Sequence, residues 1–350
     1  MQSGGIKKES GYFMHMADAL LNPAVAGTMY ACSSITAGYS VKKIRKEDND
    51  KKIPVMGVMG AFVFAAQMIN FTIPGTGSSG HLCGGMLLSA VLGPEAGFIT
   101  MIGVLLVQGF LFADGGLLAL GANIWNMAFY GCFIGGMVIW RHITGKNMSR
   151  KRIIVASMAG SIISLQLGAF SVTLETLASG VTKLPFAVFL AAMQPVHLAI
   201  GCVEGAVTAA VLVFIYETRP ELLWNYKGNG IKENRLSYKQ VVIVFAAAAA
   251  VTGGLLSLVA SSAPDGLEWS IGKVAGTTEL EAEGSIYSLA EGIQSFTSLL
   301  PDYSLKNGSS SAGTAFSGIL GGIAVIAVCA IACYIIKYFR KKALKGQENE

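Results

Sequence analysis

Charged residues are scarce in this chain of 350 residues: Asp, Glu, Lys and Arg make up 13% of it, against roughly 25% in an average soluble domain. Hydrophobic residues make up 53%. So little charge excludes an ordinary soluble enzyme. The 26 basic residues exceed the 21 acidic ones only slightly and gather in clusters, so the composition does not indicate a nucleic-acid-binding protein.

Two common site patterns are missing from the chain. The six cysteines lie in apolar stretches and none forms a Cys-x-x-Cys pair, so neither a disulfide framework nor a zinc site is expected. The P-loop pattern of nucleotide-binding proteins is absent as well, because the Gly-Lys pairs at 145–146 and 272–273 have other neighbours. The chain therefore cannot bind ATP through a P-loop.

Long apolar runs are what the chain has in abundance, and a membrane-crossing helix needs about 20 apolar residues. Seven candidate spans lie near 22–41, 53–70, 79–92, 96–112, 122–140, 152–173 and 187–216, and two more follow near 241–260 and 316–336. Because 79–92 is too short to cross alone, we expect a half-length helix inside the bundle that ends at the turn Gly93-Pro94. The predicted fold class is an all-α integral membrane protein.

Basic residues indicate the orientation of the spans, because Lys and Arg accumulate on their cytoplasmic flanks. They gather at 42–52, 141–152, 219–239 and 337–345. All four clusters fall on one side when the half-length segment is counted as a separate pass. We therefore expect a multi-pass membrane protein with its amino terminus outside and its carboxyl terminus in the cytoplasm.

Composition also divides the chain into two membrane domains. The polar, turn-prone segment 217–240 is expected to be a cytoplasmic linker. It separates a seven-span domain, 14–216, from a two-span domain, 241–345, whose loop 261–315 is rich in Ser, Gly and Glu and is expected outside. Residues 1–13 precede the first domain as an extension.

Two of the four histidines lie on the predicted outer face: His15 before the first span and His81 at the start of the third. If Met14 were the true amino terminus, its amine could chelate an ion together with the amide nitrogen and the imidazole Nδ1 of His15. His81 could add a fourth nitrogen, and four nitrogens in a plane suit Ni(II) and tolerate Co(II) or Cu(II). The dipole at a helix start would also oppose protonation of His81. Taken alone, two such histidines are more often ordinary interfacial residues.

Polar residues inside the spans can have a functional or a structural role. Glu204 lies near the middle of the seventh span and shares a helical face with His197. Because a carboxylate is costly inside a membrane, this face should point into the bundle, either for gating and coupling or for a structural hydrogen-bond network. Asn70 lies close enough to the outer face to support the loop that carries His81.

Several long motifs resemble the CbiM/NikM family, the substrate-capture membrane subunits of energy-coupling factor ABC transporters for cobalt or nickel. In chain order they read MHMADALLNPAV, KKIPVMGVMGAFVFAAQMINFTIPGTGSSGHLCGG, LLVQGFLFADGGLLALGANIWNM and HLAIGCVEGAVTAAVL, and they cover roughly residues 14–216. The later strings ASSAPDGLEW and LLPDYSL resemble the PDGLE, or NikN-like, accessory module. The chain thus resembles a fusion of a capture subunit with its accessory subunit.

The resemblance implies metal ligands at Met14, His15 and His81, with Co(II) or Ni(II) as the transported substrate and no bound cofactor. Thirteen residues, 1–13, stand before Met14, and they would convert the chelating amine into a peptide nitrogen. We therefore expect that translation starts at Met14 or that the extension is removed. The sequence Met16-Ala17-Asp18-Ala19 also departs from the family pattern, which leaves a supporting role for Asp18 open.

The resemblance also implies a location in the prokaryotic inner, or plasma, membrane. It implies partners as well: a transmembrane coupling subunit and cytoplasmic ATPase subunits, in a lipid bilayer and without nucleic acid. On this reading the chain is a transport component and not itself an enzyme. The sequence does not choose between nickel and cobalt.

Two other functions remain open at the level of sequence. Gly77-Ser78-Ser79-Gly80 matches the Gly-x-Ser-Gly pattern of intramembrane serine proteases, with Ser79 as nucleophile and His197 as base. A secondary metal transporter that works without partners is the other alternative.

Overall fold

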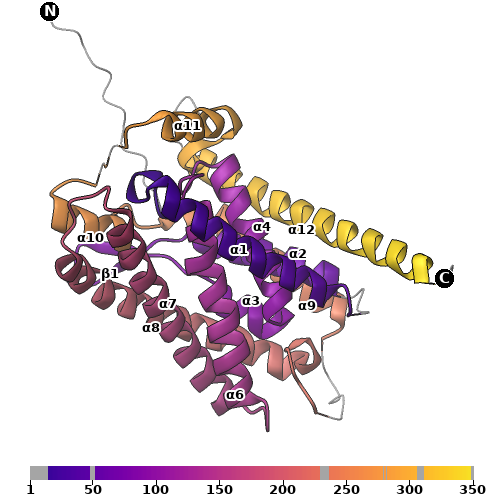
Figure 1. Cartoon of the computed structure of the whole chain (residues 1–350). Helices are drawn as coiled ribbons and strands as arrows, with labels where there is room; N and C mark the ends of the chain where they lie inside the picture. Colours follow the sequence, from indigo (N-terminus) through magenta and orange to yellow (C-terminus); the bar gives the residue numbers. More distant parts are fainter. Residues whose placement is uncertain are drawn as a thin grey trace, which may run out of the picture.

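The computed structural model describes residues 15–47, 52–228, 236–278, 280, 282–305 and 311–347, and helices make up most of it (Figure 1). The principal helices are α1 (Pro23–Ile44), α2 (Lys52–Gln67), α3 (Gly85–Leu92), α4 (Pro94–Leu111), α5 (Leu120–Asn123), the π-helix η2 (Ile124–Trp140), α6 (Arg141–Thr144), α7 (Arg150–Ser179), α8 (Phe186–Thr218), α9 (Tyr238–Gly254), α10 (Gly266–Ala275), α11 (Ser285–Thr297) and α12 (Ser311–Gln347). Short 3₁₀ turns are η1 (Asp18–Leu20), η3 (Pro220–Leu222), η4 (Leu256–Val259) and η5 (Pro301–Tyr303). Two strands, β1 (Phe71–Ile73) and β2 (Ser78–Gly80), form an antiparallel hairpin.

The expected all-α membrane class is confirmed. Six helical segments of the described chain are long and apolar enough to cross a bilayer: 94–111, 120–144, 150–179, 186–218, 238–259 and 312–341. The helix at 53–67 is apolar but shorter. The count of seven spans followed by two therefore stays a prediction.

Local chemistry sets several helix ends. The side chain of Asn22 accepts a hydrogen bond from the Val25 amide at 2.8 Å, with Pro23 in the first turn of α1. Ser237 and Gln240 form a reciprocal cap at the start of α9. At the end of α7, Gly180 has φ +62°, a left-handed conformation that favours glycine.

The half-length helix expected in the third apolar segment is α3, whose eight residues are all buried. It ends at Gly93, where φ is +86°, and α4 begins directly at Pro94. The expected start at residue 79 is wrong, because residues 78–80 form β2 and α3 begins only at Gly85. His81 consequently lies in the connection between β2 and α3, and not at a helix start.

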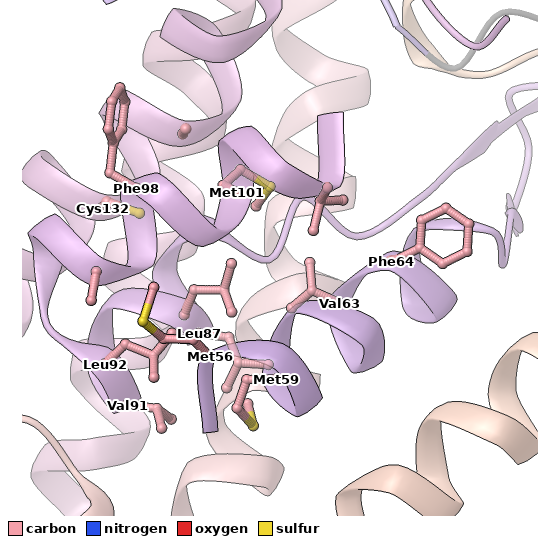
Figure 2. Close-up of a cluster of buried hydrophobic side chains, with 14 of the residues drawn as sticks. Met56, Met59, Val63, Phe64, Leu87, Val91, Leu92, Phe98, Met101 and Cys132 are labelled. Carbon is pink, nitrogen blue, oxygen red and sulfur yellow. The ribbon is translucent and has the colours of Figure 1, made fainter. Parts of the chain in front are cut away.

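A buried apolar cluster joins α2, α3, α4 and η2, and Figure 2 shows Met56, Leu87 and Leu92 of this cluster close together. Phe64, Leu88, Phe98 and Met101 are fully buried in it. This cluster fixes α3 inside the bundle, and α3 in turn fixes the connection that carries His81.

Several helices mark the two ends of the molecule. Segments α10 and α11 lie on the side where α1 begins, whereas α6 lies at the opposite end (Figure 1). The basic end of α1 meets the basic end of α12, because Arg45 donates to the Phe339 carbonyl at 3.0 Å and Arg340 to the Glu47 carbonyl at 3.3 Å.

Glycine permits close approach of α3 and η2. A Cβ added at Gly131 would lie 2.7 Å from the Cα of Gly85, and one added at Gly85 would lie 2.7 Å from the Met127 carbonyl oxygen. A Cβ added at Gly27 of α1, in contrast, would meet nothing within 4 Å. The small residue is therefore required at Gly131 and not at Gly27.

We expect Gly131→Ala to lower the free energy of unfolding by about 1–3 kcal/mol, because the methyl group forces the two backbones apart. Gly27→Ala should leave it unchanged or raise it by up to about 1 kcal/mol, since alanine is the better helix former. Thermal unfolding midpoints in detergent check both variants. Equal midpoints for the two would contradict the close packing of α3 on η2.

Candidate metal centre

The fold brings His15 and His81 together. Their ring centroids lie 5.6 Å apart, with the rings tilted by 36°. His15 precedes η1 at the start of the described chain, and His81 follows β2. Met14, the third ligand expected from the sequence, lies outside the described residues.

Asp114 fixes the imidazole of His15. The Nδ1 atom of His15 lies 2.9 Å from Oδ1 of Asp114, and both side chains are 1% exposed. The other carboxylate oxygen of Asp114 accepts a hydrogen bond from the Tyr303 hydroxyl at 2.5 Å. Burial acts to raise the pKa of Asp114, but His15 and the Tyr303 hydroxyl outweigh it and hold that pKa below its usual value.

The second ring nitrogen of His15, Nε2, differs from Nδ1 in its surroundings. Nε2 is buried and has no hydrogen-bond partner among the described residues. A buried polar atom without a partner is costly, and an open metal position is one reason to keep it. As the ring lies, Nε2 is open to an ion, and the chelate through Nδ1 expected from the sequence requires the ring to turn away from Asp114.

His81 has a different set of neighbours. Its Nδ1 lies 3.2 Å from the Leu82 carbonyl oxygen, and its Nε2 lies 3.8 Å from Oδ2 of Asp265. The side chains of His81 and Asp265 are 13% and 5% exposed. Asp265 immediately precedes α10, and its Oδ1 accepts from the Glu268 amide at 2.8 Å, so this one carboxylate caps a helix and faces an imidazole.

The chain after His15 is held by an amide side chain. Asn123 accepts from the Met16 amide at 3.0 Å and donates to the Met16 carbonyl at 3.1 Å. Asp18 accepts from the Ala119 amide at 2.9 Å, and burial raises its pKa above the usual value. Asp18 thus ties η1 to the turn before α5.

Glu204 supports the chain after His81 from within the bundle. One carboxylate oxygen accepts from the Cys83 amide at 2.6 Å and the other from the Gly84 amide at 3.2 Å. The two amides lie two and three residues after His81, immediately before α3 begins at Gly85. Glu204 therefore anchors the backbone of Cys83 and Gly84 by hydrogen bonds. A role of Glu204 in gating or coupling stays a prediction.

A cavity of about 90 Å³ adjoins the two imidazoles between η2, α7 and α8. On this measure a single water needs about 10–15 Å³, so the cavity has room for several waters. Its polar lining includes His15, His81, His197, Glu204 and Asp265. Among the described residues, no group of three or more His, Cys, Asp or Glu side chains is arranged to hold a metal ion.

Family models match almost the whole described chain. The model of the cobalt uptake substrate-specific transmembrane region, CbiM, covers residues 15–222, and the model of the PDGLE domain covers residues 239–338. The chain belongs to the CbiM family. The resemblance to a capture subunit fused with a PDGLE module is therefore confirmed.

Known relatives of this CbiM-family chain are transport proteins by name. An Archaeoglobus fulgidus protein that carries the name of a fused nickel transport protein, NikMN, is 34% identical over 316 residues, which is 90% of this chain and 96% of that protein. The cobalt transport protein CbiM of Geobacter sulfurreducens is 28% identical over 218 residues, 60% of this chain and 61% of that one. A crystal structure titled as a truncated transition metal transporter aligns with a TM-score of 0.51 at 29% identity and covers 58% of this chain and 98% of that chain.

The other residues singled out in the sequence have structural partners. The Ser79 hydroxyl donates to the Ala263 carbonyl at 2.7 Å, and His197 Nδ1 lies 2.8 Å from the Met193 carbonyl oxygen. The Asn70 carbonyl accepts from the Ser261 amide at 2.7 Å. These bonds do not join Ser79 to His197, and the relatives' names agree with a transport component in place of a protease.

Sequence reasoning missed three side chains of this centre: Asp114, Asp265 and Tyr303. Each lies within a motif that carries the family resemblance, FADGG, PDGLE and PDYS, so their motifs were visible. Their partners were not, because each contact joins segments far apart in the chain.

We expect Glu204→Gln to lower the free energy of unfolding by about 1–3 kcal/mol, because the new amide group would face a buried backbone N–H in place of an acceptor. Glu175→Gln is the matched control. Glu175 binds the Asn126 amide group at 2.8 Å and the Ser171 hydroxyl at 3.0 Å, and a glutamine can satisfy both since a hydroxyl also accepts. The thermal unfolding midpoints of the two variants in detergent check this. An equal decrease of the midpoint in both variants would contradict the anchoring role of Glu204.

Proposed function

We propose that this CbiM-family chain is the substrate-capture subunit of an energy-coupling factor transporter that imports Ni(II) or Co(II). The observation that supports it most is the close pair of imidazoles, His15 and His81, whose ring centroids lie 5.6 Å apart. Imidazole nitrogens are preferred ligands of these metals.

The donor set favours backbone nitrogens as the remaining ligands. The described residues offer no third His, Cys, Asp or Glu in a metal-binding cluster. The amine of Met14 and the amide of His15 would complete four nitrogens, which suits a planar Ni(II) site better than a tetrahedral Zn(II) site. The carboxyl groups of Asp114 and Asp265 stand beside the imidazoles, where they favour a dication over a neutral ligand.

The site would open to the outside of the cell. The basic clusters near α6 and at the ends of α1 and α12 lie away from α10 and α11 (Figure 1), and such clusters mark the cytoplasmic side. Because the sequence has no P-loop, inward release would be driven by partner ATPase subunits through a transmembrane coupling subunit.

Isothermal titration of Ni(II) into the chain beginning at Met14 should show tight binding that is lost in His81→Ala, because the variant lacks one of four nitrogen donors. His142→Ala is the control, since His142 lies in α6 at the opposite end of the molecule. Unchanged affinity in His81→Ala would overturn the ligand assignment.

A free amine at Met14 should matter as much as His81. We expect the chain beginning at Met1 to bind Ni(II) at least about tenfold more weakly than the chain beginning at Met14, because a peptide nitrogen replaces the amine donor. Parallel titrations measure the difference. Mass spectrometry and amino-terminal sequencing of native protein identify the mature start, and tight binding by a native chain that keeps residues 1–13 would contradict the chelate.

A further inference from the structure

A second cavity lies at the end of the molecule where α6 is found (Figure 1). Its volume is about 350 Å³, and a single water needs about 10–15 Å³ on this measure, so a group much larger than one ion fits by volume. Four of its lining residues have basic side chains: Arg141, His142, Lys146 and Lys227. Among the described residues that line it, none is Asp or Glu. The cavity therefore has the charge of an anion-binding site.

The cations of this cavity differ from a basic residue nearby, because they lack an acidic partner. Arg150 pairs with Glu217 at 3.6 Å. In the part of the chain that the structure describes, no ion pair of this kind involves Arg141, Lys146 or Lys227. Like charges gathered without a counter-ion repel one another, and an anion between them would be attracted to all three. The cavity thus favours a ligand that brings negative charge.

Hydrogen bonds hold the walls of the cavity together. The Trp140 indole at the end of η2 donates to the Trp224 carbonyl at 3.4 Å, and the Trp224 amide donates to the Ala90 carbonyl at 2.8 Å. Asn225 has φ +66°, a left-handed conformation, and a Cβ added at Gly145 would lie 3.3 Å from its Nδ2 atom. The turn after α6 and the chain after η3 are therefore packed together, and the cavity between them belongs to the fold.

The cavity also has an apolar wall, formed by Met137 and Val138 of η2. Both residues belong to the apolar segment 120–144, which is long enough to cross a bilayer, and Val138 is 55% exposed. Arg141 lies in the last turn of this segment and Lys146 just beyond it, where a spanning helix reaches the phosphate headgroups of the membrane. A ligand that fills the cavity meets basic groups on one side and apolar groups on the other.

We propose that this cavity binds an anionic phospholipid, with its phosphate between Arg141, Lys146 and Lys227 and an acyl chain along Val138. A soluble phosphate would use only the basic wall, whereas a phospholipid uses both walls. Basic pockets between spanning helices on the cytoplasmic side of a membrane hold such headgroups. The site is separate from the metal centre, which lies beside α10 at the opposite end of the molecule (Figure 1).

A bound lipid would join two parts of the chain. Arg141 and Lys146 belong to the region 15–222 that the CbiM model matches, whereas Lys227 lies between this region and the PDGLE region, 239–338. A phosphate held by all three side chains ties the connection between the domains to the first domain. An anionic lipid should therefore raise the unfolding temperature of the chain.

The experiment measures binding of phosphatidylglycerol to the full chain in detergent by native mass spectrometry. It also compares the thermal unfolding midpoint in this lipid with that in zwitterionic phosphatidylcholine. We expect the chain to retain phosphatidylglycerol and to unfold at a higher temperature with it. In the triple variant Arg141→Gln, Lys146→Gln, Lys227→Gln, binding should weaken at least about tenfold and the rise in midpoint should disappear, because each basic group near an anionic lipid strengthens binding about fivefold.

A matched control removes the same number of charges from another basic cluster on the same expected flank of the membrane. The variant Lys42→Gln, Lys43→Gln, Lys46→Gln neutralises the end of α1, which does not line the cavity. This control should keep both the bound phosphatidylglycerol and the rise in midpoint. Equal weakening in the two triple variants would mean that a basic surface attracts anionic lipid in general, and it would overturn the site.

The fold of each variant is checked by its midpoint in phosphatidylcholine, which should equal that of the unmodified chain. Lys146→Gln alone, at an exposed position, is the second variant and should weaken phosphatidylglycerol binding about fivefold. Displacement of the lipid by inorganic phosphate at a comparable concentration would identify a soluble anion as the ligand. Unchanged phosphatidylglycerol binding in the triple variant of the cavity would leave the cavity to an acidic segment of a protein partner. Either result overturns the proposal.

Discussion

The hydrogen bond between His15 and Asp114 is the interaction on which the position of the His15 ring depends. Both side chains are almost completely buried, and an unpaired polar atom in such surroundings costs about 1–3 kcal/mol. Asp114 resolves this with two partners, His15 and Tyr303. The pairing holds the His15 ring in one place, and it leaves Nε2 as a polar atom for which the described residues supply no partner.

Unusual backbone conformations make this arrangement possible. Ala113 has φ +55° and Gly115 has φ +84° on either side of Asp114, and together they turn the chain so that the carboxylate points inward. A Cβ at Gly115 would lie 2.7 Å from the Cβ of His15, so the close approach also needs glycine there. The non-glycine Ala113 in a left-handed conformation is strained, and such strain commonly collects at functional sites.

Some of this architecture follows from sequence, and some does not. Length and apolar composition predict spans such as 94–111 and 186–218, and the turn Gly93-Pro94 predicts the half-length α3, because these features are local. The hairpin 71–80 was missed, since two three-residue strands give almost no periodic signal. The residue types and outward placement of His15 and His81 suggested a pair, but its carboxyl partners are set by tertiary contacts that no local pattern encodes.

Fusion of the two domains has a physical consequence for the site. A separate accessory subunit would lose translational and rotational freedom on docking, a cost estimated at about 4–15 kcal/mol. A tethered segment meets its docking surface at high effective concentration, and the contacts of Ser261, Ser79 and Trp269 are among those that hold it there. The carboxylate of Asp265 lies beside His81, and the hydroxyl of Tyr303 is bonded to Asp114. Because the fold holds both groups in a single chain, the surroundings of the two histidines form without a separate docking step.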